Sequence, residues 1–210
     1  MKDDYFFDVK RKRPEEQYES VSDYFNNEKL SSYAKSKSIM HIQRKITLRA
    51  LELLELKKDH SLILDAGCGP GFVAMYLHEL GHKTIALDII SNFLNFYDIK
   101  DLNPILADMC YTPFQPNVFD AIISISALQW ICKDLSTQKM SLNLSNLFIS
   151  FHTILKPNGR VIFQFYPKNK TLLNKIRDLI SKNTSFEGNF VIDNPNSPKK
   201  RKIYLLLIKE

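Results

Sequence analysis

The sequence predicts an α/β fold built on a mostly parallel, Rossmann-like sheet that ends in an antiparallel hairpin. Two observations carry this prediction. Short apolar runs alternate with helical patterns between residues 61 and 107, which is the rhythm of parallel βαβ units. Near the end of the chain, the apolar runs 189–192 and 203–208 are joined by a polar segment rather than a helix. Such a pair indicates an antiparallel hairpin.

The chain has 210 residues, of which 44% are hydrophobic and 25% are charged, a size that suits one core better than two. We expect residues 1–30 to form an N-terminal arm or lid, because they are polar, charged and aromatic without a sustained period. Residues 31–210 should form a single domain. No apolar stretch approaches the roughly 20 residues that cross a bilayer, and the first residues do not resemble a signal peptide. We therefore expect an intracellular protein with no membrane partner.

The expected elements follow from local patterns. Apolar residues recur at helical spacing from Ile39 to Leu54, which predicts an amphipathic helix ending near Lys57-Lys58-Asp59. A three-layer fold with a seven-stranded sheet is predicted, with strands at residues 61–65, 83–88, 104–107, 119–124, 160–166, 189–192 and 203–208. Further helices are expected at residues 72–80, 92–99, 142–155 and 172–182. Lys156-Pro157-Asn158-Gly159 should form the turn that opens the fifth strand.

The strongest motif is Asp65-Ala66-Gly67-Cys68-Gly69-Pro70-Gly71, which lies between the first strand and the next helix. Ligands bind at the carboxyl ends of the strands in such sheets, and glycines let the backbone turn tightly beside a ligand. A dinucleotide fingerprint, G-x-G-x-x-G, would need a glycine where Phe72 stands, and no G-x-x-x-x-G-K-[ST] phosphate loop is present. The spacing of Gly67, Gly69 and Gly71 therefore favours S-adenosylmethionine over NAD.

Acidic residues at successive strand ends extend this expected cofactor site. Asp88, followed by Ile89, ends the second strand roughly 20 residues beyond the glycines, where a carboxylate can accept both ribose hydroxyls. Asp108 and Met109 follow the third strand, where a carboxylate can bond the adenine amino group while the thioether packs on the ring. Asp65 lies under the loop and should act near the methionine moiety through amides or water. Each acid alone could be a helix cap, but together they indicate a cofactor site.

The stretch from Ser124 to Trp130 follows the fourth strand and should face the cofactor and the methyl acceptor, with Ser124 on the cofactor side. It lacks the [Asn/Asp]-Pro-Pro-[Phe/Tyr] element of amino-methyltransferases, and Cys132 is not expected to be a nucleophile. A ring nitrogen such as guanine N7 carries an in-plane lone pair and no proton, so its methylation needs alignment rather than a general base. Trp130 could stack on a base and Gln129 could bond its edge, although a lone tryptophan is more often a core residue.

Cysteines and histidines indicate no metal site. Cys68, Cys110 and Cys132 are far apart and odd in number, so neither a disulfide framework nor a zinc site is suggested. The net charge is +6, with basic clusters at residues 10–13 and 199–202. These clusters could contact phosphates or could be solvated surface.

Several segments carry a family resemblance that covers nearly the whole chain. They are Arg13-Pro14-Glu15, Tyr33 to Leu54, Ser124 to Cys132, Gln164-Phe165-Tyr166-Pro167, Val191 to Ser197 and Lys202 to Leu206. Together they closely resemble the eukaryotic small-subunit (18S) rRNA guanine-N7 methyltransferase family, which has the class I methyltransferase fold. The Ser-Ile-Ser-Ala-x-Gln-Trp and Asp-x-Pro-Asn-Ser elements are the more specific ones, since the glycine loop is shared by all class I methyltransferases.

The resemblance implies S-adenosylmethionine-dependent N7-methylation of one guanosine in small-subunit rRNA during ribosome assembly, in the nucleus or nucleolus and the cytoplasm. Gln129 and Trp130 would then face the acceptor, and Tyr33 with the arm before it would close over the cofactor. It also implies an obligate small zinc-binding activator protein that adds a strand beside the third strand. That strand should lie at the sheet edge and carries Pro104, so its free side suits β-augmentation.

Two other functions remain open at this point. The cofactor half does not distinguish methyl acceptors, so an activator-dependent methyltransferase of tRNA or of a small molecule is an alternative. The second is a ribosome-assembly factor whose binding matters more than its catalysis. It is motivated by Lys37-Ser38-Ile39, which stands where the family usually has Ser-Arg-Met.

Overall fold

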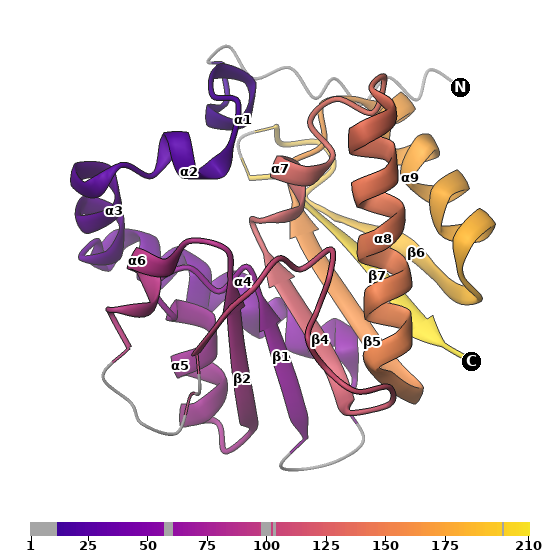
Figure 1. The fold of residues 1–210 in the computed structure, drawn as a ribbon, viewed down its shortest axis with the longest axis horizontal. Helices are drawn as coiled ribbons and strands as arrows, with labels where there is room; N and C mark the ends of the chain where they lie inside the picture. Colours follow the sequence, from indigo (N-terminus) through magenta and orange to yellow (C-terminus); the bar gives the residue numbers. More distant parts are fainter. Residues whose placement is uncertain (1–11, 57–60, 98–101, 103, 199) are drawn as a thin grey trace.

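A computed structural model describes residues 12–56, 61–97, 102, 104–198 and 200–210 (Figure 1). The helices are α1 (Pro14–Gln17), α2 (Val21–Tyr24), α3 (Asn27–Ala34), α4 (Lys37–Leu54), α5 (Phe72–Glu79), α6 (Ser91–Leu94), α7 (Leu128–Ile131), α8 (Gln138–Ile154) and α9 (Lys170–Asn183). The strands are β1 (Leu62–Ala66), β2 (Lys83–Asp88), β3 (Pro104–Leu106), β4 (Phe119–Ile125), β5 (Leu155–Phe165), β6 (Phe186–Asp193) and β7 (Lys202–Lys209). No helix in these ranges is both long and apolar enough to cross a membrane.

The strands form a seven-stranded sheet in the order β3-β2-β1-β4-β5-β7-β6. Strands β3, β2, β1, β4 and β5 are parallel, and β7 runs antiparallel to both β5 and β6. The predicted parallel sheet with a terminal hairpin is therefore confirmed, and the third strand lies at the edge as expected. The order reverses between β1 and β4, which places a crevice at the carboxyl ends of those strands.

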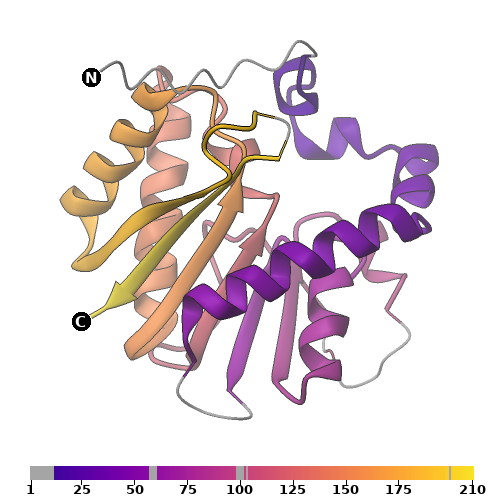
Figure 2. The same cartoon turned by 180° about the vertical axis from the view of Figure 1, so that it is seen from behind.

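Helices cover both faces of the sheet, as the three-layer prediction requires. Helices α4 and α5 pack on one face, where Ile46, Ala50 and Leu54 of α4 meet Val73 and Leu77 of α5. Figure 2 shows α4 crossing that face of the sheet. Helices α8 and α9 cover the other face, where α8 lies in front of β5 in Figure 1 and α9 lies beside α8. The central strands of the sheet therefore carry apolar residues on both faces.

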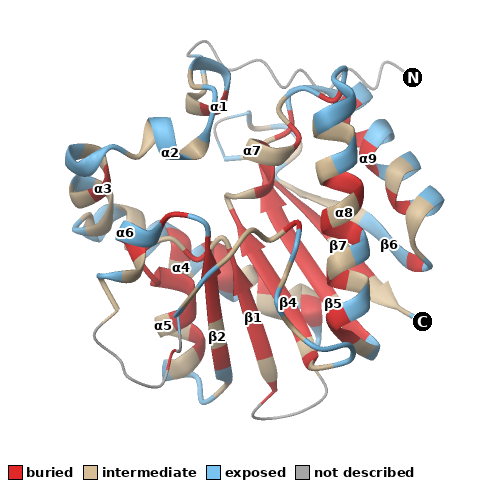
Figure 3. Ribbon diagram, in the orientation of Figure 1, coloured by how far each residue is buried: buried red, intermediate tan, exposed pale blue. Residues whose placement is uncertain are grey.

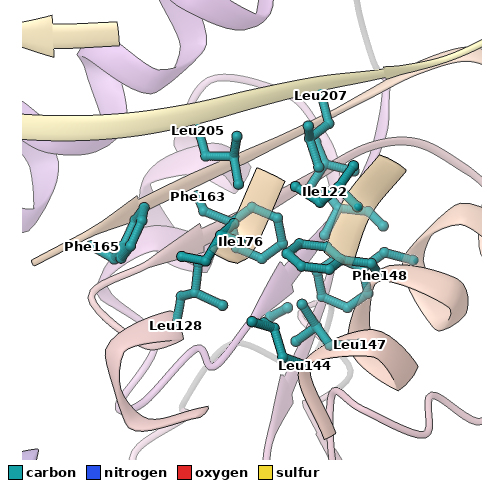
Figure 4. Packing of buried hydrophobic residues seen from close by; sticks show 14 of the residues in the cluster. Ile122, Leu128, Leu144, Leu147, Phe148, Phe163, Phe165, Ile176, Leu205 and Leu207 are labelled. Carbon is teal, nitrogen blue, oxygen red and sulfur yellow. The ribbon is translucent and has the colours of Figure 1, made fainter. Parts of the chain in front are cut away.

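The larger core lies under α8 and α9 (Figure 4). Phe163 of β5 is fully buried and stacks on Phe151 of α8 with ring centroids 5.6 Å apart, while Phe148 meets the same ring edge-on at 5.9 Å. Burying a phenylalanine side chain stabilises a fold by about 1.5–3 kcal/mol. Figure 3 shows in red that β4 and β5 are buried along most of their length, as this apolar core requires.

The described part of the expected arm consists of three short helices that stand above the sheet edge (Figure 1). Their starts are fixed locally, since the Ser20 hydroxyl caps α2 at Asp23 N and the Asn26 side chain caps α3 at Lys29 N. Helix α3 runs across residue 30, the boundary predicted between arm and domain. Its one buried residue, Leu30, packs with Ile90 and Phe93 beyond β2.

Most predicted elements begin or end at a different residue in the structure, and three of these differences have a local cause. Helix α4 ends at Leu54, before the predicted 57–59, because Glu55 adopts a left-handed conformation with φ of 45°; residues 57–59 lie outside the described part. Helix α6 ends at Leu94 rather than near residue 99, because the chain turns there and the Tyr97 ring packs against Gly71. The predicted turn at 156–159 lies inside β5, where the register shifts as an irregularity between the pairs with Phe119 and Ala121.

Candidate functional site

A cavity of about 1170 Å³ lies where the parallel strands end. One wall is formed by the segments that follow β1, β2 and β3, and another by the segments that follow β4 and β5. The arm contributes the remaining wall through α1, α2 and Tyr33 of α3. The position matches the carboxyl-end crevice in which ligands of doubly wound sheets bind.

The glycine loop is shaped for close contact. Gly67, Gly69 and Gly71 all have positive φ values, of 77°, 53° and 89°, which only glycine adopts at little cost. A Cβ on Gly67 would lie 2.5 Å from the Ala127 Cβ, and one on Gly71 would lie 2.7 Å from Cζ of Tyr97. A Cβ on Gly69 would meet nothing within 4 Å. The loop is therefore packed against the protein at both ends and open at its centre, where it lines the cavity.

Asp88 holds this loop in place. Its Oδ2 accepts a hydrogen bond of 2.8 Å from Gly69 N, and its Oδ1 accepts one of 2.8 Å from Ile90 N. Burial raises the pKa of Asp88, while these backbone N–H groups act in the opposite direction. Each carboxylate oxygen keeps a second lone pair, so Asp88 remains able to accept a ligand hydroxyl.

Asp65 carries a carboxylate that is almost fully buried beneath the glycine loop. It is 1% exposed, and neither oxygen has a hydrogen-bond partner in the described structure. Burial raises its pKa to about 8, against a smaller opposing effect of the Ala74 backbone amide. A buried anion of this kind is costly unless a cation or donors are supplied. S-adenosylmethionine would bring an ammonium group and a sulfonium to the glycine loop above Asp65, and these positive charges would offset the buried carboxylate through the loop.

The segment after β3 forms the remaining cofactor wall. Asp108 Oδ1 accepts a hydrogen bond of 2.8 Å from Cys110 N, which fixes the carboxylate at the cavity. The Met109 Cε lies close to Gly67, 2.9 Å from where its Cβ would stand, and Ile89 is 50% exposed after β2. Asp108, Met109 and Ile89 all line the cavity. An amino-bearing aromatic ring could be bonded and covered there.

The end of β4 is held by a hydrogen-bonded link to β5. Ser126 has a φ of 59°; its N–H donates to Gln164 O at 2.8 Å, and its hydroxyl donates to Gln164 Oε1 at 3.0 Å. Gln129 of α7 donates from Nε2 to Ser126 O at 2.7 Å, while its Oε1 has no partner in the described structure. Gln129 and the half-buried Trp130 both line the cavity. The left-handed backbone conformation of Ser126 thus turns the chain from β4 into α7, so that α7 lies at the cavity.

Not every residue expected in the site lines the cavity. Ser124 lies within β4, is 0% exposed, and does not belong to the wall, whereas Ser126 and Ala127 do. Asp65, which is 1% exposed, and Gly71, which packs against Tyr97, do not belong to the wall either. Tyr33 does line the cavity, as expected, and its ring lies 5.9 Å from that of Phe72. Burial raises the pKa of Tyr33 to about 12, so its hydroxyl stays protonated at neutral pH.

The arm is tied to the acceptor side of the site by basic side chains. The Arg13 guanidinium donates to the carbonyl of Tyr166, just after β5. Lys133, after α7, donates from Nζ to the carbonyl of Tyr18 at 2.8 Å and also to that of Glu19. The Tyr24 ring in α2 lies 5.6 Å from Trp130. These contacts bring aromatic residues of the arm beside α7.

Two of these roles were not foreseen in the sequence. Lys133 looks like a surface lysine, and nothing in its neighbourhood signals that it reaches the arm. Gln164 left a weak signal, since it is a polar residue in the apolar run Val161-Ile162-Phe163-Gln164-Phe165. A buried glutamine in a central strand needs partners, and it finds one in Ser126.

Cysteine chemistry does not enter the site. Cys132 is 1% exposed, and burial raises its pKa to about 12, so the thiol is protonated and a poor nucleophile at neutral pH. Cys68 and Cys110 are also free and buried. Within the described ranges, no group of three His, Cys, Asp or Glu residues is arranged to hold a metal ion.

Known proteins resemble this chain in sequence and in fold. Residues 64–163 match the methyltransferase domain family. The chain is 36% identical over 191 residues to the 18S rRNA (guanine-N7)-methyltransferase of Bos taurus, covering 88% of this chain and 67% of that one. The corresponding enzyme of Schizosaccharomyces pombe is 34% identical, with 88% and 70% covered, and that of Saccharomyces cerevisiae is 39% identical, with 83% and 64% covered. The chain thus spans about two thirds of the length of these curated relatives.

Solved structures confirm the fold. A TehB-like S-adenosylmethionine-dependent methyltransferase from Corynebacterium glutamicum superposes with a TM-score of 0.65 at 16% identity, covering 88% of this chain and all of that one. A phosphoethanolamine N-methyltransferase from Haemonchus contortus gives a TM-score of 0.68 at 16% identity, covering 96% of this chain and 61% of that one. The fold is that of class I methyltransferases, whose methyl donor is S-adenosylmethionine. With the sequence relationships above, this chain belongs to the 18S rRNA (guanine-N7)-methyltransferase family.

Proposed function

We propose that this protein transfers a methyl group from S-adenosylmethionine to N7 of one guanosine in small-subunit rRNA during ribosome biogenesis. The single observation that carries the proposal is the joint placement of the glycine loop and of α7 in one cavity. One side offers a cofactor site, and the other offers Trp130 and Gln129 to a planar acceptor. The relatives named for this reaction supply the identity of that acceptor.

The cofactor residues have separate tasks in this proposal. The open centre of the loop at Gly69 lets the backbone approach the methionine moiety, and Asp65 compensates its positive charge from below. Asp88 accepts the ribose hydroxyls with its remaining lone pairs, and Asp108 accepts the adenine amino group. Met109 and Ile89 cover the adenine ring. Tyr33 closes the cavity from the arm.

The acceptor residues need to align the base and exclude water. When bound, the cofactor supplies a methyl group on a sulfonium, which is activated for transfer without a metal or a base. Guanine N7 carries no proton, so no residue has to remove one before its lone pair attacks. Trp130 fixes the plane of the ring, and stacking of this kind is worth about 1–3 kcal/mol per base. The glycine loop and Asp88 would hold the cofactor so that its methyl group faces the ring that Trp130 aligns, and the guanine ring would take up the positive charge with the methyl group.

Mapping of N7-methylguanosine tests the reaction. In cells depleted of this protein, reductive cleavage of small-subunit rRNA should lose one site, and wild-type protein should restore it. The name of the Saccharomyces cerevisiae relative places its methyl group at guanine 1575, so the equivalent guanosine is the first to inspect. An unchanged cleavage pattern after depletion would exclude the proposal. A Gly69→Glu variant that restores subunit assembly without the methyl group would show that assembly depends on the protein itself rather than on methylation.

We further propose that a small zinc-binding activator binds at β3, forming a heterodimer. Strand β3 has three residues, begins with Pro104, and pairs with β2 on one side, at the edge of the sheet. Leu106 of β3 is 58% exposed and Tyr111 is 59% exposed. The Tyr111 hydroxyl accepts a hydrogen bond of 2.8 Å from Asn146 of α8, where Leu142 is 57% exposed. An added strand would pair with the open edge and cover these apolar side chains.

Coexpression tests the activator. The chain should be recovered in higher yield with the activator than alone, and Leu106→Asp should abolish copurification while cofactor binding by the chain is kept. Leu48→Asp offers a matched control, because Leu48 of α4 is 47% exposed on the opposite face of the sheet. Equal yield and full activity without any partner would contradict the heterodimer. Nuclear and nucleolar location, which the family membership suggests, is testable by imaging the tagged chain.

A further inference from the structure

Two buried hydrogen-bond acceptors face the acceptor side of the cavity. Glu15 of α1 is 6% exposed and lines the cavity together with Gln129. The backbone N–H of Glu15 donates to its own carboxylate, and the charges of Arg13 and Lys168 act on it as well. The Gln129 Oε1 has no partner among the described residues, and its orientation is fixed because Nε2 must be the atom that donates to Ser126 O. Of these two, Glu15 is the acceptor that this wall offers to a ligand, because the Gln129 Oε1 atom is itself buried.

Arg13 and Lys168 lie near Glu15 and oppose the rise of its pKa, but both side chains also bind other groups. Arg13 directs its guanidinium to the Tyr166 carbonyl, and Lys168 forms an ion pair of 3.3 Å with Glu16 on the other side of α1. Burial raises the pKa of Glu15, as it does for a carboxylate held out of water. The charge of Glu15 also reaches Cys132 at the end of α7, which places the carboxylate beside the helix that carries Trp130. A largely buried carboxylate in the cavity wall is stabilised further when a ligand supplies hydrogen-bond donors.

The geometry of N7-methylation determines which edge of the base meets this wall. When N7 faces the glycine loop, the opposite edge of the purine faces away from the cofactor, toward the arm and α7. On that edge guanine carries two donor groups, N1–H and the 2-amino group. Adenine carries an acceptor at N1, so it would oppose acceptor to acceptor. A carboxylate that accepts from both donors of guanine therefore distinguishes the two purines.

We propose that Glu15 is a specificity-determining residue, which accepts hydrogen bonds from N1–H and the 2-amino group of the acceptor guanine. This inference rests on the proposed function and adds the means of base selection to it. The same contact should also raise the rate of methyl transfer. Methyl transfer gives the ring a positive charge, which strengthens N1–H as a donor, so a carboxylate opposite it stabilises the developing charge.

Nucleotide binding measures this selection without any methyl transfer. Trp130 is the only tryptophan of the chain, so stacking of a base beside it should change the intrinsic fluorescence. The full chain, purified with any subunit that copurifies and saturated with S-adenosylhomocysteine, is titrated with guanosine, inosine and adenosine 5′-monophosphates. Inosine lacks the 2-amino group, and adenosine lacks both donors. The wild type should bind the guanosine nucleotide about 10-fold more tightly than either, within the range of a good base-edge contact.

Glu15→Gln is the decisive variant, because it keeps the shape of the side chain but replaces one acceptor by a donor. It should reduce the preference for guanosine over adenosine at least 10-fold while melting temperature and S-adenosylhomocysteine affinity stay unchanged. Glu28→Gln, an equal change at an exposed position of α3 outside the cavity wall, should leave the preference intact. A wild type without preference, or a Glu15→Gln variant that weakens all three nucleotides equally, overturns the inference.

Failure of this inference is distinguishable from failure of the proposed function. If depletion leaves every N7-methylguanosine of the rRNA in place while the nucleotide preference depends on Glu15, the rRNA assignment is wrong and the base selection stands. If the methyl group is lost on depletion but Glu15→Gln keeps both the preference and full methyl transfer, the rRNA assignment stands and the base selection by Glu15 is wrong.

Discussion

The two halves of the cavity are built in different ways. On the cofactor side, acidic side chains bind backbone N–H groups within a short stretch of chain, as Asp88 does with Gly69 and Ile90. On the acceptor side, contacts join segments far apart in the sequence, as Lys133 does with Tyr18 and Arg13 with Tyr166. The cofactor half is therefore preformed by the sheet, whereas the acceptor half is complete only when the arm is in place.

A substitution at the junction of the two halves should have the largest effect. In Gly67→Ala, the new Cβ would lie 2.5 Å from the Ala127 Cβ at a φ of 77°, so both the loop and the start of α7 must move. We expect cofactor affinity to fall at least 100-fold and the free energy of unfolding to fall by about 1–3 kcal/mol. Calorimetric titration with S-adenosylhomocysteine measures the first and denaturant unfolding the second.

Gly69→Ala provides the matched control for Gly67→Ala, because it has a similar positive φ of 53° but no atom within 4 Å of the new Cβ. It should cost stability through backbone strain alone. Equal effects of the two variants on cofactor affinity would show that the contact with Ala127 does not matter for cofactor binding. The cofactor half and the acceptor half of the cavity would then act independently.

The pH dependence of stability should report on Asp65. Its pKa of about 8 in the folded protein lies well above the value of roughly 3.9 in an unfolded chain, so the folded state binds the proton more tightly. The stability from this group is present below pH 4 and is lost as the pH rises toward 8. At about 1.4 kcal/mol per pKa unit, the loss amounts to a few kcal/mol in the absence of cofactor.

Denaturant unfolding at pH 5, 6.5 and 8 measures this loss, and Asp65→Asn should flatten the profile over the same range. Saturating S-adenosylhomocysteine, whose ammonium group compensates the carboxylate, should also flatten it for the wild type. A wild-type profile that rises between pH 5 and 8 would be the opposite of the expected sign. It would show that Asp65 is ionised and partnered without ligand.

Removal of the stacking surface should affect the acceptor half alone. Trp130→Ala should lower kcat/KM for RNA about 10-fold or more, in line with the loss of about 1–3 kcal/mol of base stacking. Cofactor affinity should stay within about 2-fold, because Trp130 follows β4 and not the glycine loop. Trp130→Phe, which keeps a smaller ring, should recover part of the activity. A large loss of cofactor affinity in Trp130→Ala would contradict the division of the cavity.

Release of the arm should have the smallest effect on global stability. Lys133→Met removes two hydrogen bonds to arm carbonyls while keeping the apolar stem. Because Lys133 is half-exposed, the loss should be about 1 kcal/mol or less. Hydrogen exchange of residues 12–34 should accelerate while the exchange of β1 and β4 is unchanged. Lys139→Met on α8, an exposed lysine, is the control, and equal arm protection in both variants would show that Lys133 does not hold the arm.

Sequence patterns predicted the sheet well, because apolar runs mark the positions of its buried strands. Strand β2 lies where residues 83–88 were expected, and β1 and β3 differ from the prediction by at most one residue at either end. Strand β5 begins at Leu155, five residues before the predicted start, and β6 begins at Phe186, three residues before it. The cofactor residues were predicted from their places at strand ends, and their role stays a prediction. Ser124 shows the limit of this reasoning. The strand continues one residue beyond it, and so the cavity wall begins at Ile125.

The arm could not be predicted in the same way. Helices of four to eight residues are too short to show a 3.6-residue period, and their positions depend on contacts with α6 and α7. Glu15 looks solvent-exposed between Arg13 and Glu16, and its burial arises only because α1 rests on the ends of β5 and α7. Tertiary contacts, rather than local preference, decide which of these charges is withdrawn from water.

The arm limits the stage of ribosome assembly at which the proposed methylation can occur. A base that sits between α7 and the arm is covered on both sides, so it must leave its neighbours in the strand before it enters. A guanosine locked in a finished helix of the mature subunit would have to break its pairing first. Methylation should therefore fall in the interval before the surrounding RNA has folded, and the arm would act as a check on the maturity of the substrate.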